Sequence, residues 1–126
     1  MKQKSTGDLT GELTSTASFD AYLRANEPFF SEQGVAELAR RSGISEVYLH
    51  QVFAGRRIPS RDRLLCICIG LSLTLEETQR MLTQGSYALL YPRTKRDAII
   101  SYGLVHQLPL QEINDKLFAE QEKSLF

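Results

Sequence analysis

The sequence predicts an all-helical protein, and three observations support this prediction. From Ser18 onward, large apolar residues recur three and four positions apart, which is the spacing of one helix face. Most of these runs follow Ser or Thr, which cap helices well, and several are followed by Gly, which commonly ends them. The pattern contains no convincing pair of strands. We therefore expect short helices separated by short connections.

The chain begins with a segment that differs from the rest. Residues 1–17 are rich in Ser, Thr and Gly and poor in large apolar residues, so we expect a flexible tail. Ser18 then caps a short helix that Pro28 ends or follows. The apolar face of this helix is Phe19, Tyr22 and Leu23.

Two helices joined by a tight turn are predicted next. The first spans about Gln33 to Ser42, and Gly43 follows where the chain needs a left-handed turn. Its apolar stripe is Val35, Leu38 and Ala39. Ile44 fills the corner, Ser45 caps the second helix, and Ala54-Gly55 ends it. The inward residues of the second helix are Leu49, Val52 and Phe53.

Four further segments complete the prediction. Pro59 and Ser60 open a nearly all-apolar helix that ends at Gly70, and such a helix is expected to be central and buried. Thr74 and Glu77 match a capping box at the start of a helix that ends at Gly85. After the connection 86–92, whose Tyr87, Leu89, Leu90 and Tyr91 are expected on the core, helices span about 94–106 and 110–120. The inward residues of the last helix are predicted to be Ile113, Leu117 and Phe118.

Composition excludes several classes of protein. The chain has 126 residues, 42% of them hydrophobic and 24% charged, which suits one soluble domain. No apolar run is long enough for a membrane span, and no secretory signal is evident, so we expect a cytoplasmic protein without a membrane partner. Cys66 and Cys68 are badly placed on a helix for a shared metal or a disulfide, and we expect them to fill the core.

Charge is unevenly distributed along a chain whose net charge is zero. Residues 34–63 hold six arginines against three carboxylates, which leaves a net charge of +3. Residues 1–33 hold three basic and five acidic residues, which leaves −2. The basic charge is thus concentrated around the predicted pair of helices, where it favours a polyanionic partner.

The segment LARRSGISEVYLHQVFAGRRIPSRDRLL resembles the helix-turn-helix of phage repressors, Cro proteins and many bacterial regulators. The resemblance covers roughly residues 18–85 and implies a five-helix, repressor-like DNA-binding domain, here with two additional C-terminal helices. The corresponding division of the chain is a tail (1–17), a helix-turn-helix domain (18–90) and a helical extension (91–126). In that family the second helix of the motif reads the major groove.

The resemblance also implies roles for individual residues. The base-reading residues would be Ser45, Glu46, Val47, Tyr48 and His50. The phosphate contacts would come from Arg56, Arg57 and Arg61, since the guanidinium fork suits phosphate oxygens. Glu46 could accept from a cytosine amino group, and Val47 could contact a thymine methyl group.

Each of these residues also has an ordinary structural interpretation. The arginines, Arg63 included, could be a solvated loop and helix start, with Arg61 or Arg63 paired to Asp62 or Glu37. His50 could be a plain surface residue, Tyr48 could pack in the core or a dimer, and Glu46 could serve only the helix N-terminus.

The C-terminal segment leaves two questions open. Its basic cluster, Arg93, Lys95 and Arg96, lies at a helix start, where it either binds something or only solvates a loop. Its apolar residues form either a cap on the domain or a surface for a homodimer or another protein. These residues are Ile99, Ile100, Leu104, Ile113, Leu117 and Phe118.

No arrangement typical of catalysis is present. The chain lacks a Gly-rich phosphate loop and an HExxH motif, and it has only two histidines. Only a Ser-His-Asp triad from distant residues stays open. We therefore expect no enzyme, no cofactor and no metal site. The first hypothesis is a sequence-specific regulator that binds double-stranded DNA, and the second is a protein-interaction adaptor that keeps the fold without binding DNA.

Overall fold

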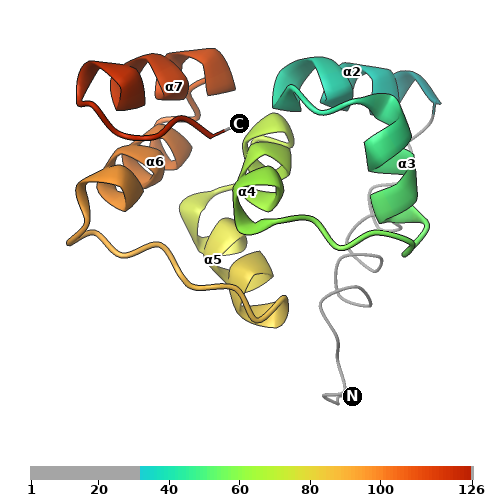
Figure 1. The fold of residues 1–126 in the computed structure, drawn as a ribbon, viewed down its shortest axis with the longest axis horizontal. Helices are drawn as coiled ribbons and strands as arrows, with labels where there is room; N and C mark the ends of the chain where they lie inside the picture. The colour runs from blue at the N-terminus through green and yellow to red at the C-terminus, as the bar shows by residue number, and fades with distance from the viewer. Residues whose placement is uncertain (1–31, 126) are drawn as a thin grey trace.

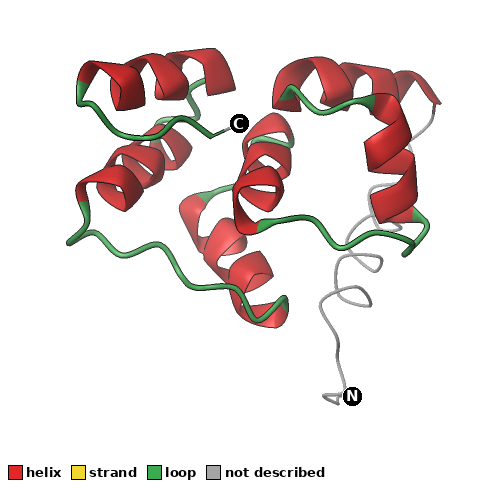
Figure 2. Cartoon of the chain, in the orientation of Figure 1, coloured by secondary structure: helices red, strands yellow, loops and turns green. Residues whose placement is uncertain are grey.

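The computed structural model describes residues 32–125 and is all-helical, with six helices and no strand in this range (Figures 1 and 2). The helices are α2 (Glu32–Ser42), α3 (Glu46–Phe53), α4 (Arg61–Gly70), α5 (Leu75–Gln84), α6 (Lys95–Val105) and α7 (Leu110–Ala119). The predicted tail and the helix expected after Ser18 lie outside the described residues. None of these six helices is long and apolar enough to cross a membrane.

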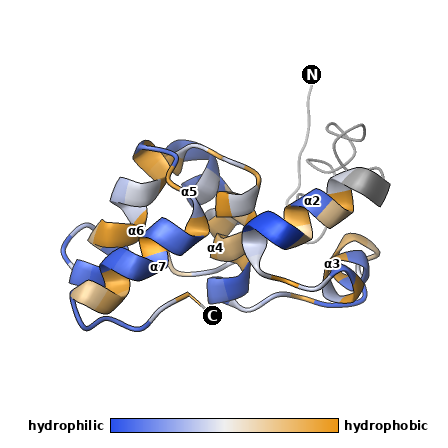
Figure 3. Ribbon diagram, turned by 90° about the horizontal axis from the view of Figure 1, so that it is seen from above, coloured by the Kyte–Doolittle hydropathy of each residue, from blue (hydrophilic) through white to orange (hydrophobic). Residues whose placement is uncertain are grey.

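Helix α4 is the centre of the fold, as its apolar sequence predicts. Every residue from Leu64 to Gly70 is buried, because α2, α5 and α7 all pack against this helix. Cys66 and Cys68 are fully buried free thiols, which confirms the expected core role. The hydrophilic residues of α2 and α7 face outward (Figure 3).

Side-chain caps set the starts of three helices where the sequence predicts them. The Ser45 hydroxyl accepts from the Tyr48 amide at 3.1 Å, and Ser60 does the same for Arg63 at 3.2 Å. Thr74 and Glu77 form the complete capping box, with distances of 2.9 and 3.0 Å. These caps satisfy amides that a helix start leaves without partners, so α3, α4 and α5 begin at defined residues.

The turn between α2 and α3 depends on a glycine in the left-handed region. Gly43 has φ 71°, and its amide donates to the Ala39 carbonyl at 2.9 Å. The next residue, Ile44, is buried, and its amide lies 3.3 Å from the buried Ser42 hydroxyl. The turn therefore connects two short helices through a filled apolar corner.

Gly70 and Gly85 stand at the predicted helix ends, but the left-handed residues are Ser72 and Ser86, with φ 58° and 61°. Gly70 serves the packing of α2 on α4 instead. A Cβ there would lie 2.8 Å from the Leu38 side chain and within 3.3 Å of α2 backbone, closer than carbon atoms pack. The sequence pattern identified this glycine, but its role comes from a tertiary contact.

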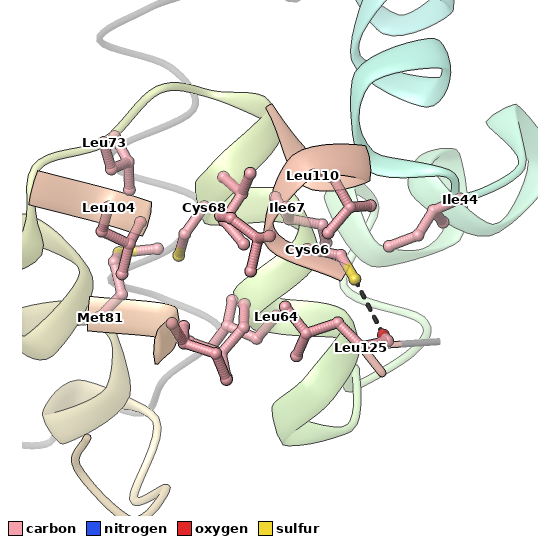
Figure 4. Close-up of a cluster of buried hydrophobic side chains, with 14 of the residues drawn as sticks. Ile44, Leu64, Cys66, Ile67, Cys68, Leu73, Met81, Leu104, Leu110 and Leu125 are labelled. Carbon is pink, nitrogen blue, oxygen red and sulfur yellow. Dashed lines mark hydrogen bonds between the residues drawn. The ribbon is translucent and has the colours of Figure 1, made fainter. Parts of the chain in front are cut away.

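The C-terminal helices form a cap that shares one core with the rest of the described chain. Their inward side chains Ile100, Leu104, Ile113 and Leu117 are buried against α4 and α5, as the cap alternative requires. Figure 4 shows this shared core, in which the Cys66 thiol donates to the Leu125 carbonyl at 3.1 Å. Residues 91–125 are therefore part of the same packed unit as α2 to α5.

Three aromatic and aliphatic placements were wrong. Phe118 was expected inward but is 83% exposed, because it lies about 100° around the helix from Leu117, which points to the core. Tyr91 is 60% exposed, and Leu89 is also exposed, because Leu90 alone turns inward in this part of the connection. Tyr87 is half-buried and packs against the core as expected.

Candidate functional site

Helix α3 presents one exposed face to solution. Four of the five predicted base-reading residues are exposed, namely Ser45, Glu46, Val47 and His50, and the Val47 side chain is 69% exposed. The opposite face is fixed in the core by Leu49 and Val52. The exposed side chains therefore stand on a helix whose position is set by packing.

The first turn of α3 carries a polar and an acidic group. The Ser45 hydroxyl accepts a helix amide, and its own hydrogen stays available for an outward acceptor. Glu46 is exposed in the turn where the helix dipole favours an acid, so its structural interpretation also fits. Either side chain could contact a partner that approaches the start of α3.

Tyr48 differs from its neighbours because its ring is half-buried and packs against the core. Two guanidinium groups contact this ring: the Arg57 Cζ atom lies 5.0 Å from the ring centroid, and the Arg63 Cζ atom lies 4.6 Å from it. Both distances are within the range of cation–π attraction. Tyr48 thus joins α3, the loop that follows it, and the first turn of α4.

The loop from Gly55 to Ser60 is held at several points. Gly55 is left-handed, with φ 75°, and the Arg56 amide donates to the Gln51 carbonyl at 2.8 Å, which closes the end of α3. The Arg57 Nε atom donates to the Gln51 side-chain oxygen at 2.9 Å. The Tyr87 hydroxyl donates to the Pro59 carbonyl. These contacts fix the backbone that carries Arg56 and Arg57.

Arg61 does not lie with the exposed Arg56 and Arg57. Its Nε atom donates to the Ala88 carbonyl at 2.8 Å, and its Nη2 atom donates to the Leu89 carbonyl at 2.9 Å and the Asp97 carboxylate at 3.3 Å. The guanidinium is turned toward the connection before α6 and toward α6 itself. The phosphate contact predicted for Arg61 is therefore replaced by an anchoring role for the C-terminal segment.

Ion pairs separate the arginines of the described chain into two groups. Arg40 and Arg41 pair with Glu37, Arg61 pairs with Asp97, and Arg96 pairs with Asp62. In the same range no carboxylate pairs with Arg56, Arg57, Arg63, Arg80 or Arg93. Arg56 and Arg57 directly follow α3 and Arg63 contacts Tyr48 on α3, whereas Arg80 and Arg93 lie on α5 and before α6. The interpretation of Arg63 as a partner of Asp62 or Glu37 is thus wrong.

The Glu37 pair removes positive charge from the end of α2. Hydrogen bonds from Arg40 and then Arg41 lower the pKa of Glu37 from 4.5 to about 2. The carboxylate therefore stays ionised at neutral pH and offsets part of the basic charge of α2. Arg56, Arg57 and Arg63, which follow α3 in the chain, have no such ion pair in the described range.

The basic cluster at the start of α6 is engaged mostly within the chain. Arg96 contacts Asp62, and the Lys95 ammonium lies 3.6 Å from the Glu120 carboxylate. Only Arg93 of the three predicted residues has no such partner in the described range.

Sequence reasoning missed two residues of this region: Gln51, which holds Arg57, and Arg63, which contacts the Tyr48 ring. Arg63 was expected only in a solvated loop and helix start, and Gln51 was assigned no role. Arg63 lies fifteen residues after Tyr48 in the chain, so no local spacing indicates their contact. Only the tertiary fold, which brings the first turn of α4 to the Tyr48 ring, places them together.

The described surface also has a groove away from α3. A groove of about 510 Å³ between α6 and α7 is lined mainly by Ala98, Ile99, Tyr102 and Ala119. Among the residues that the structure describes, no group of three His, Cys, Asp or Glu could hold a metal ion. In comparisons with protein-family models, with curated proteins and with solved structures, nothing matches this chain.

Proposed function

We propose that this protein is a sequence-specific DNA-binding transcriptional regulator. In this proposal α2, the Gly43 turn and α3 are a helix-turn-helix of the phage-repressor type, and α3 enters the major groove. The buried corner at Ile44 and the exposed first turn of α3 support it. The cap formed by α6 and α7 would be an addition to this domain that stabilises α4 from behind.

The observation that carries the proposal is a set of arginines on or near α3 that pair with no carboxylate among the described residues. Arg56 and Arg57 lie directly after α3, and Arg63 lies in the first turn of α4. The guanidinium group is always charged and presents a planar fork to phosphate oxygens. A DNA backbone on either side of α3 would supply negative partners for these arginines.

The exposed residues of α3 would then supply sequence preference. Val47 would contact a thymine methyl group, Glu46 would accept from a cytosine amino group, and His50 would donate or accept at a base edge. Ser45 would contribute its free hydroxyl hydrogen. Each well-formed base contact discriminates against a wrong base by about 1–3 kcal/mol.

Selection from a random-sequence duplex pool tests the proposal. The full chain should enrich a defined sequence, and Val47→Ala should relax the preference at one position of it. The matched control is Ala36→Ser, an exposed change on α2 that should leave the enriched sequence unaltered. Enrichment of no sequence by the unaltered chain would refute sequence-specific recognition.

A homodimer is also proposed, because one short helix reads few bases and two-fold partners usually bind half-sites about 34–36 Å apart. Sedimentation of the selected duplex with the protein should give two chains per duplex. The selected sequence itself should be palindromic. One chain per duplex would refute the dimer while leaving DNA binding intact.

The second candidate function is a protein-interaction adaptor, which two exposed apolar residues favour. Val47 on α3 is 69% exposed and Ile58 in the following loop is 68% exposed. Exposed apolar side chains on one face are typical of protein contacts as well as of thymine contacts. A photo-cross-linker at position 58 distinguishes the two, because it should capture DNA for a regulator and only protein for an adaptor.

A further inference from the structure

The contact of Tyr48 with two arginines has a consequence for what the site binds. The ring is half-buried on α3, and it touches one guanidinium from the loop and one from α4. A ring held in this way by the core and by two cations is poorly placed to reach outward to a base edge. Its exposed neighbour Val47 has no such constraint.

Each arginine is oriented by its surroundings. Arg57 is held by the ring and by the Gln51 side chain, 2.9 Å away. Arg63 is the third residue of α4, and its backbone amide donates to the hydroxyl of the N-cap residue Ser60. A cation is unfavourable in the first turn of a helix, and the Tyr48 ring offsets this cost. The same two features, a helix N-terminus and a guanidinium, both favour an anion beside them.

We infer that Arg57, Tyr48 and Arg63 form one phosphodiester-binding unit, in which Tyr48 is a positioning residue and does not read bases. This inference rests on the proposed DNA-binding function. The ring restricts two flexible guanidinium groups before the phosphate arrives, which reduces the entropy lost on binding. The hydroxyl of Tyr48 is dispensable in this role, because the ring face makes both contacts.

Arg56 provides an internal comparison. It is exposed, and no side-chain hydrogen bond or ring contact orients it in the described structure. We expect it to contact phosphate as a flexible side chain, so its contribution should be independent of Tyr48. A variant at this position therefore reports on phosphate contact without the ring.

The test measures binding to a duplex selected from a random pool and to a scrambled duplex, by fluorescence anisotropy over a salt series. Tyr48→Phe should keep both affinities. Tyr48→Leu should weaken binding to both duplexes by the same factor, about three- to tenfold. In an Arg57→Gln/Arg63→Gln background, Tyr48→Leu should change affinity less than about twofold, whereas it should keep its full effect in an Arg56→Gln background.

Two results would overturn the inference. The first is a changed ratio of selected to scrambled affinity in Tyr48→Phe, which would make the hydroxyl a base reader. The second is a full effect of Tyr48→Leu in the background without Arg57 and Arg63. If Tyr48→Leu does not fold, as judged by circular dichroism, Tyr48→Phe and Arg63→Gln test the inference instead. Arg63→Gln should weaken binding to the selected and the scrambled duplex by the same factor. An unaltered chain that binds no duplex would instead refute the proposed function itself.

Discussion

Arg96→Ala should loosen the C-terminal segment from α4. The Arg96 guanidinium donates two hydrogen bonds to the Asp62 carboxylate, at 3.2 and 3.1 Å, and one each to the Lys123 and Ser124 carbonyls, at 2.8 and 3.1 Å. It therefore joins α6, the start of α4 and the chain after α7. Alanine removes all four contacts at once.

The size of the effect follows from partial burial. The Arg96 side chain is 19% exposed, and that of Asp62 is 25% exposed. Loss of one partner costs about 0–1 kcal/mol for exposed pairs and about 3–5 kcal/mol for buried ones. Lys123, 3.9 Å from Asp62, keeps that carboxylate partly compensated. We expect a loss of about 2–3 kcal/mol, which lowers Tm by roughly 8–12 °C for a chain of this size.

Urea unfolding followed by circular dichroism measures this loss. Arg93→Ala is the matched control, because Arg93 is exposed three residues earlier and enters no ion pair in the described chain. It should change stability by less than about 0.5 kcal/mol. In a double-mutant cycle, Asp62→Asn should cost clearly less once Arg96 is alanine. Arg96→Ala at wild-type stability would refute the view that this contact ties the C-terminal segment to α4.

Three further predictions concern packing, acid stability and thiol reactivity. Gly103→Ala should destabilise the protein by about 1–2 kcal/mol, after allowance for the better helix propensity of alanine, because the new Cβ would lie 2.4 Å from the Ile113 side chain. The control Ser101→Ala should not destabilise it. Equal stabilities of the two variants in urea unfolding would contradict this prediction. The pKa of Glu37 is lower in the fold, so its contribution is complete above pH 4.5 and is lost between pH 4.5 and about 2. Glu37→Gln should therefore flatten the pH dependence of Tm in that window, and an unchanged profile would count against the pair. Burial raises the pKa of both cysteine thiols to about 12, so a thiol reagent at pH 8 should label them only at the rate of unfolding; fast labelling of the native chain would contradict their burial.

Local signals in the sequence predicted most of the helix boundaries. Ser45, Ser60 and Thr74 cap helices through contacts within four residues, and Gly43 makes its turn through its own backbone conformation. Such features depend little on the rest of the fold, and for this reason they can be recognised in a single sequence. The buried α4 was equally clear, because its apolar residues occupy every side.

Contacts between distant segments could not be predicted in the same way. Arg61 and Asp97 are thirty-six residues apart, and nothing near Arg61 in the sequence shows that its guanidinium turns away from the loop. The contact between Tyr48 and Arg63 also depends on how the tertiary fold places the first turn of α4 relative to α3. Phe118 was misplaced because it is next to the buried Leu117 in the chain, and only packing decides which of two neighbouring apolar residues points inward.

The salt dependence of duplex binding tests the central claim most directly. Anisotropy should compare the unaltered chain with Arg56→Gln/Arg57→Gln/Arg63→Gln and with the control Arg80→Gln/Arg93→Gln, whose arginines lie away from α3. Each lost phosphate contact reduces the magnitude of the slope of log K against log salt by about 0.9. This slope should therefore be about 2.7 smaller in the triple variant and unchanged in the control. No binding by the unaltered chain at low salt, or equal slopes in all three proteins, would contradict DNA recognition through α3 and its arginines.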